Sequence, residues 1–236
     1  MLDNSLKEQV KAVFANLESE YIFDVYASKG SDSYNELVDL LEDVASCSDK
    51  LSVITNDGEA LSFLLLKNGE PTGIVFRGVP TGHEFTSFLL AVLNSDGKGK
   101  NMPDEFTRKR VKALKGEIKL TTFVSLTCTN CPDVVQALNQ MAILNPGITH
   151  EMVDGSLYPE EANSFNIQAV PAVYADGEQL HVGRGDFGKL LSKLEEKYGA
   201  EEIAYDNEPR TFDVVVVGGG PAGAASAIYS ARKGLT

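Results

Sequence analysis

Apolar side chains along this chain recur with two alternating spacings, one typical of a strand and one typical of a helix. Residues 21–28 (YIFDVYAS) predict a strand, and apolar side chains in residues 33–45 recur every third or fourth position, as in an amphipathic helix. The same pair returns about 100 positions later, as a strand over residues 118–126 (IKLTTFVSL) and a helix over residues 131–144. This alternation of strands and helices predicts an α/β fold.

The rest of the pattern also occurs twice, so the chain contains an internal repeat as long as a small domain. Each copy has an initial helix, the strand and helix above, a second strand, a hairpin with Asn-Gly or Asp-Gly at its turn, and a closing helix. The remaining elements are predicted at residues 6–17, 51–55, 68–70 (turn) and 84–93 in the first copy, and at 103–114, 149–153, 176–178 (turn) and 187–198 in the second. We therefore predict one domain over residues 1–100 and another over residues 101–198.

Polar stretches that contain glycine separate these blocks. Residues 94–103 (NSDGKGKNMP) predict the joint between the two copies, and residues 199–211 predict a linker after the second. Residues 212–236 then change character, with an apolar strand over 212–217 (FDVVVV), a glycine-rich turn and an alanine-rich helix over 224–233. One strand and one helix cannot build a core, so we expect this segment to be the truncated start of a third domain.

Composition narrows the class of protein. The 236 residues are 43% hydrophobic and 23% charged, an ordinary balance for a globular protein. The net charge of −13 argues against a nucleic-acid surface, which needs clustered lysine and arginine. No apolar run approaches the roughly 18 residues of a membrane helix, and the N-terminus lacks the pattern of a secretory signal. Three cysteines are too few for a disulfide scaffold, so we expect a reducing, cytoplasmic setting.

The sequence Cys128-Thr-Asn-Cys131 directly follows a predicted strand and begins a predicted helix. Backbone N–H groups and the dipole at a helix N-terminus favour a thiolate, so this position lowers the pKa of the first cysteine. We predict that Cys128 is the exposed attacking thiol and Cys131 the buried resolving thiol. Pro132 suits an early helical position, because its missing N–H costs little there.

Two other interpretations of this pair stay open, a chance occurrence and half of a zinc site. A zinc site needs two more ligands at matching spacing. The chain offers one further cysteine and three scattered histidines: Cys47, His83, His150 and His181. We therefore predict no metal and a redox-active disulfide, the use typical of this motif near a βα unit. We expect Cys47 to be a small buried apolar residue.

A proline lies 40 residues after Cys131, just before the predicted hairpin strand, in the sequence Val170-Pro171-Ala-Val. Proline is disfavoured inside a strand unless it lies at an edge or a special bend. A cis peptide bond before Pro171 would explain its position and would place a backbone edge beside the dithiol, where a partner chain could pair. A plain proline on an edge strand is the alternative.

The three glycines Gly218, Gly220 and Gly223 follow the apolar strand at 212–217 with the spacing of a dinucleotide-binding turn. Such glycines allow a tight turn and a close approach to pyrophosphate at a helix N-terminus. The acidic residue that would bind the ribose is expected about 20 residues later, beyond Thr236. We predict part of a dinucleotide site that does not bind its ligand alone.

Together these motifs resemble a known family. The order of elements over residues 117–198 is similar to that of thioredoxins and glutaredoxins. The whole chain resembles the N-terminal part of the flavoprotein subunit of alkyl hydroperoxide reductase, a family of peroxiredoxin reductases. Four segments carry the resemblance: 76–85 (FRGVPTGHEF), 127–132 (TCTNCP), 168–171 (QAVP) and 213–223 (DVVVVGGGPAG). The resemblance implies two tandem thioredoxin-like folds followed by the start of a Rossmann-type FAD domain.

The resemblance also implies an electron relay. In the family, NADH reduces FAD, FAD reduces a dithiol in the C-terminal flavoprotein module, and that dithiol reduces the N-terminal one, which reduces a peroxiredoxin. Transferred to this sequence, Cys128 attacks the peroxiredoxin disulfide and Cys131 resolves the mixed disulfide. The NADH domain, the second dithiol and most of the FAD domain are absent from this sequence, so we expect it to need an outside reductant. The family forms homodimers, largely through those absent parts.

The first copy has Ser31 and Tyr34 where a dithiol would align, so we expect it to have no redox chemistry of its own. We predict that this copy supports the neighbouring site and that Glu84 tunes it, by exchanging protons with the dithiol or by opposing formation of the thiolate. The alternative is that Glu84 is an ordinary acidic residue at a helix N-terminus.

Two further functions stay open. One is a free-standing, glutaredoxin-like protein disulfide oxidoreductase, although such proteins often carry a dithiol in each copy. The other is a docking module in which the dithiol is incidental. The redox interpretation predicts a reversible, accessible disulfide, whereas the docking interpretation predicts that Cys128→Ser leaves function intact.

Overall fold

The computed structural model describes residues 2–28, 30–99, 101–203 and 211–236. These residues form two units, one up to Glu202 and one from Ile203 to Thr236, which we describe separately. Within the described ranges, no helix combines the length and the apolar composition needed to cross a membrane.

The larger unit contains two halves whose elements follow the same order, apart from one additional described helix in the second half. The first half has α1 (Asn4–Phe14), β1 (Tyr21–Ala27), α2 (Asp32–Ala45), β2 (Leu51–Asp57), β3 (Ser62–Lys67), β4 (Glu70–Arg77) and α3 (Glu84–Ser95). The second half has α4 (Glu105–Ala113), β5 (Ile118–Val124), α5 (Cys131–Leu144), β6 (Ile148–Asp154), α6 (Pro159–Ser164), β7 (Ala172–Ala175), β8 (Glu178–Val182) and α7 (Phe187–Tyr198). Only the second half has a described helix, α6, between its second and third strands.

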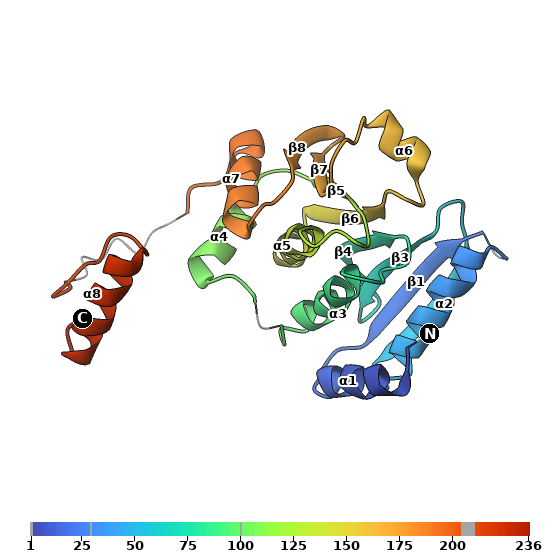
Figure 1. The fold of residues 1–236 in the computed structure, drawn as a ribbon, viewed down its shortest axis with the longest axis horizontal. Helices are drawn as coiled ribbons and strands as arrows, with labels where there is room; N and C mark the ends of the chain where they lie inside the picture. Colours follow the sequence, from blue (N-terminus) through green and yellow to red (C-terminus); the bar gives the residue numbers. More distant parts are fainter. Residues whose placement is uncertain (1, 29, 100, 204–210) are drawn as a thin grey trace. The chain divides into compact units, whose positions relative to one another are not determined.

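The eight described strands belong to one sheet, in the order β2-β1-β3-β4-β6-β5-β7-β8 (Figure 1). Each half contributes four strands in the same relative order, which confirms the internal repeat. The two halves join where β4 pairs in parallel with β6, with Ile74 opposite His150 and Arg77 opposite Val153. Because β4 and β6 pair with each other through backbone hydrogen bonds, neither strand is an exposed edge of the sheet.

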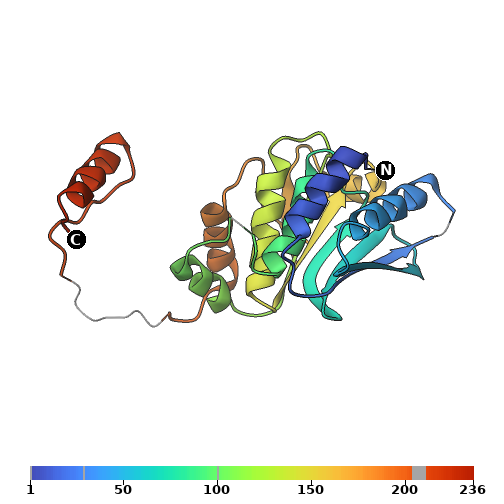
Figure 2. The same ribbon diagram turned by 90° about the horizontal axis from the view of Figure 1, so that it is seen from below.

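The helices cover the two sides of the sheet unequally. Figures 1 and 2 show α2, α3 and α5 along one side of the strands, with α6 on the opposite side. The main core lies under the first group, and in the first half it centres on Phe88, which makes edge-to-face contacts with three other buried phenylalanines. These are Phe23, Phe63 and Phe76. A smaller apolar cluster under α6 contains Phe123 and Tyr174.

Local sequence signals explain many of the boundaries. Asn68 and Gly69 both have positive φ at the first hairpin turn, and Asp176 and Gly177 do so at the second, as the turn residues predict. The predicted helices 131–144 and 187–198 agree with α5 and α7 at both ends. The initial helix predicted over 6–17 instead begins at Asn4, where Asp3 caps it, and ends at Phe14.

The smaller unit corrects one prediction. Residues 212–217 do not form a strand, whereas the helix predicted over 224–233 is present as α8 (Pro221–Arg232). Val217 is 95% exposed and α8 has no buried residue. An apolar segment becomes a strand only when neighbouring strands accept its backbone hydrogen bonds, and this unit provides none within its described residues. Most of the predicted linker, residues 204–210, lies outside the described residues.

Candidate redox site

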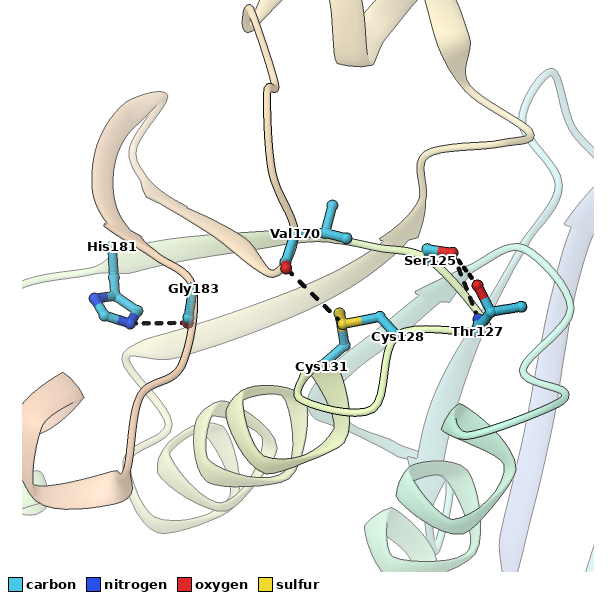
Figure 3. Close-up of a disulfide and its surroundings, with 7 residues drawn as sticks. All are labelled: Ser125, Thr127, Cys128, Cys131, Val170, His181 and Gly183. Carbon is cyan, nitrogen blue, oxygen red and sulfur yellow. Dashed lines mark hydrogen bonds between the residues drawn. A yellow bond between two sulfur atoms is a disulfide. The ribbon is translucent and has the colours of Figure 1, made fainter.

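Cys128 and Cys131 form a disulfide between the end of β5 and the first turn of α5 (Figure 3). Their Cα atoms are 5.5 Å apart. Cys131, the first residue of α5, is fully buried, whereas Cys128 is partly exposed. The burial therefore agrees with the predicted division into an accessible and a protected sulfur.

The backbone around the disulfide is arranged to favour a thiolate. The Cys128 N–H donates to the Ser125 carbonyl at 2.9 Å, which closes the turn that leads into the helix. Asn130 precedes α5 without capping it through its side chain, and Pro132 occupies the first turn. The first N–H groups of α5 therefore lack a side-chain acceptor from the capping position. Their partial positive charge, together with the helix dipole, stabilises a nearby sulfur anion.

The Val170–Pro171 segment faces the disulfide. The peptide bond between these residues is cis, the first of the two alternatives considered above, and Pro171 lies immediately before β7. The Val170 carbonyl oxygen lies 3.9 Å from Cys128 Sγ (Figure 3). A disulfide sulfur carries no hydrogen, so this is a contact in the oxidised state, and a Cys128 thiol at the same place could donate to the carbonyl.

Glu84 is fully buried at the first turn of α3, the helix that packs beside α5. The loop before it contacts the turn before the disulfide, because the His83 N–H donates to the Leu126 carbonyl at 3.1 Å. Neither carboxyl oxygen of Glu84 has a hydrogen-bond partner of ordinary geometry within the described part of the chain. Desolvation raises the pKa of Glu84 to about 7, and the Ser87 hydroxyl offsets only a part of this.

The other candidate ligands lie apart from the dithiol or are already bonded. Buried His150 contacts Thr122 Oγ1 at 2.8 Å and Asn139 Oδ1 at 2.7 Å, and His181 Nε2 faces the Gly183 carbonyl. Cys47 is a buried free thiol, as expected. Among the described residues, no three histidine, cysteine, aspartate or glutamate side chains are placed to hold a metal ion.

The three glycines of the predicted dinucleotide turn belong to the smaller unit. A Cβ on Gly223 would lie 2.0 Å from the Gly218 carbonyl oxygen, so only glycine fits this turn. Gly220 immediately precedes α8 and provides no side-chain cap, and a helix N-terminus of this kind suits a phosphate. These residues therefore fit the pyrophosphate part of a dinucleotide site.

Sequence reasoning missed the surroundings of Arg77. This residue lay within one of the family motifs without a role, yet its side chain pairs with two glutamates of the second half, Glu151 and Glu161. An arginine among the apolar residues of a strand was the available signal. Its partners, more than 70 positions away, gave no signal of their own.

Known proteins match this chain both in its second half and over its whole length. The family model of the thioredoxin domain matches residues 117–194, within the half that holds the disulfide. Over its whole length the chain is 44% identical to a Bacillus subtilis protein named NADH dehydrogenase and 42% identical to the F subunit of alkyl hydroperoxide reductase from Pseudomonas aeruginosa. It covers 45% of each of these relatives, so it spans less than half their length.

A solved structure extends the comparison to the tandem arrangement. The crystal structure of the NTD_N/C domain of alkylhydroperoxide reductase AhpF from Enterococcus faecalis is similar, with a TM-score of 0.75 and 32% identity. The similarity covers 82% of this chain and 100% of that one. It confirms the predicted fold of two tandem thioredoxin-like halves.

Proposed function

This chain belongs to the family of the alkyl hydroperoxide reductase flavoprotein AhpF, and on that premise we propose that its Cys128–Cys131 pair is a thiol–disulfide relay. The pair takes electrons from a flavoprotein module of the same protein and passes them to the disulfide of a peroxiredoxin, which detoxifies peroxides. The observation that supports this proposal most strongly is the disulfide itself, with one accessible and one buried sulfur at an uncapped helix N-terminus.

The exchange balances in two steps. The Cys128 thiolate attacks one sulfur of the peroxiredoxin disulfide, forming a mixed disulfide and releasing one peroxiredoxin thiolate. The Cys131 thiolate then attacks Cys128 Sγ, which releases the second peroxiredoxin thiolate and closes the Cys128–Cys131 bond. Two electrons and two protons leave this dithiol, and the peroxiredoxin gains them as two thiols. The Val170 carbonyl and Pro171 form the edge along which the partner chain docks, next to Cys128.

Glu84 is the proposed proton acceptor for the dithiol. A carboxyl whose pKa is about 7 can take up and release a proton near neutral pH, which an ordinary glutamate cannot. Its place at the start of α3, beside α5 and behind the turn at Leu126, supports this role. Cys131 must lose its proton before it can resolve the mixed disulfide, and a buried acceptor suits a buried thiol.

The whole protein would include the cofactor domains. Gly218, Gly220 and Gly223 would hold the pyrophosphate of FAD, and FAD when bound supplies electrons that originate from NADH. We further propose a reducing, cytoplasmic location, where the disulfide of a dithiol carrier can be reduced again after each transfer. We also propose that the whole protein is a homodimer.

The test is direct transfer to a partner. The chain is reduced with dithiothreitol, desalted and mixed with an oxidised bacterial peroxiredoxin, and thiols on each protein are counted. We expect about one disulfide reduced per dithiol, no transfer by Cys128→Ser, and a trapped mixed disulfide with Cys131→Ser. Cys47→Ser is the matched control and should behave as the unmodified chain.

Two results would change the assignment. A reversible disulfide without transfer to the peroxiredoxin would indicate a general oxidoreductase of the glutaredoxin kind. Binding of the peroxiredoxin with equal strength by the chain and by Cys128→Ser, without any transfer, would indicate a docking module.

A further inference from the structure

Arg77, the last residue of β4, spans the boundary between the two halves. Its guanidinium makes two hydrogen bonds to the Glu161 carboxylate, at 2.9 and 2.6 Å, and a third contact to Glu151 at 3.4 Å. It also lies over the Tyr158 ring, 4.2 Å from the ring centre. The Arg77 side chain is only 15% exposed, so this pairing is much less screened by water than a surface ion pair.

The helix that Arg77 holds has few apolar contacts of its own, and within it Ala162 packs against the smaller apolar cluster. None of the six residues of α6 is buried. The first half supplies a further contact at the start of this helix, because the Tyr158 hydroxyl donates to the Leu61 carbonyl at 2.8 Å. At Gly78, a Cβ would come within 2.9 Å of Asp154 Cβ, so the two halves approach closely beside Arg77.

The far end of α6 leads toward the disulfide. Phe165 follows the helix and packs against Phe123 and Tyr174, whose hydroxyl donates to the Phe165 carbonyl at 3.0 Å. Only residues 166–169 then separate Phe165 from Val170, the residue whose carbonyl faces Cys128. A displacement of α6 would therefore reach the wall of the redox site through a short piece of chain.

We propose that Arg77 is a positioning residue for disulfide exchange, which holds α6 from the half without a dithiol and thereby fixes the segment 165–170 beside Cys128. The inference rests on the proposed function and adds a role for the first half. Replacing Arg77 removes the cation that pairs with both Glu151 and Glu161, so two carboxylates lose the counter-charge that they share. The helix shifts, and the docking edge at Val170 shifts with it.

The test compares Arg77→Met and Glu161→Gln with the unmodified chain. Glu160→Gln is the matched control, because Glu160 is an exposed neighbour on the same helix. With dithiothreitol as the reductant that restores the dithiol after each turnover, we expect KM for oxidised peroxiredoxin, and for insulin as a general protein disulfide, to rise about tenfold in both variants, because substrate docking is weakened. Alkylation of Cys128 by iodoacetamide needs no docking, and its rate should stay within about twofold of the unmodified chain. The double variant Arg77→Met/Glu161→Gln should raise KM little more than either single variant, because both substitutions remove the same ion pair.

A second measurement does not depend on activity. The amide groups of Asn166 and Ile167 donate to the Asn163 and Ala162 carbonyls, and their hydrogen exchange should speed up about tenfold in Arg77→Met and Glu161→Gln. Far-UV circular dichroism checks that Glu161→Gln, the milder change, is folded. Unchanged exchange at these amides overturns the proposal, even if the chain proves inactive toward both substrates. Equal losses in substrate reduction and in alkylation would also overturn it, since they indicate general unfolding.

Discussion

Glu84→Gln keeps the shape of a side chain and removes its charge, so it measures what burial of an ionisable carboxyl costs this protein. In the folded chain, desolvation raises the pKa of Glu84 to about 7 from an ordinary value of 4.5. The protonated carboxyl is thus the form that the folded state prefers. The stability that the protonated Glu84 side chain gives to the folded state is fully present below pH 4.5, and it is lost as the pH rises to about 7.

The size of this change in stability follows from the difference between the two pKa values of Glu84. The two pKa values are about 2.5 pH units apart, and each unit corresponds to 1.36 kcal/mol, which gives about 3 kcal/mol. Glutamine does not titrate, so the variant avoids this loss. We expect equal free energies of unfolding for the two proteins at pH 4, and a variant more stable by about 3 kcal/mol at pH 8.

The assay is urea unfolding of the oxidised proteins at several pH values, followed by far-UV circular dichroism because the chain has no tryptophan. Every other titrating group is shared, so the difference between the two proteins isolates Glu84. Glu105→Gln, which removes an exposed acid from the first turn of α4, is the control and should show no such pH dependence. A stability difference that stays the same from pH 4 to pH 8 would refute the reasoning.

The same variant tests the proposed role in proton exchange. In reduced protein with Cys47→Ser, the pH dependence of Cys128 alkylation reports the thiolate. Glu84→Gln should shift this profile, because a carboxylate that charges near pH 7 opposes a neighbouring thiolate. An unchanged profile together with the stability effect would leave Glu84 a buried structural acid.

Two further predictions concern the fold. Phe88→Ala should destabilise the larger unit by about 3–5 kcal/mol, because this ring is fully buried among three other phenylalanines. The control is Val13→Ala, at an exposed position of α1, which should change the free energy of unfolding by less than about 0.5 kcal/mol in the same urea assay. Deleting residues 211–236 should leave the thermal unfolding midpoint of the larger unit unchanged, because α8 buries no residue; a lower midpoint would show that the smaller unit stabilises the larger one.

The elements that periodicity and turn chemistry specify locally were predictable. The helix at 131–144 was predicted to the residue because its apolar positions and its cysteine start are all local signals. The hairpin turns were predicted because Asn68 and Asp176 precede glycines, and positive φ is a local requirement. The dithiol was found for the same reason, since its spacing and its place at a helix start both lie within a few residues.

What could not be predicted depends on distant partners. The parallel joint of β4 with β6 leaves no mark in either strand, since the sequence of each would also suit an edge strand. Arg77 meets Glu161 only because the sheet brings residues 84 positions apart together. The segment 212–217 shows the opposite error, because its apolar run predicts a strand whose pairing partners the chain does not provide in its described residues.

In the proposed relay, the position of the first half explains how a copy without a dithiol supports the dithiol of the second. Because β4 continues the sheet into β6, both sides of the first half reach the second. On one side α3 carries Glu84 alongside α5, which holds Cys131. On the other side Arg77 holds α6, which leads to Val170. In the proposed relay, Glu84 accepts the proton of the buried sulfur, and Arg77 positions the edge beside the accessible sulfur. A half that supplies both groups needs a rigid joint, and a shared sheet is stiffer than a linker between separate domains.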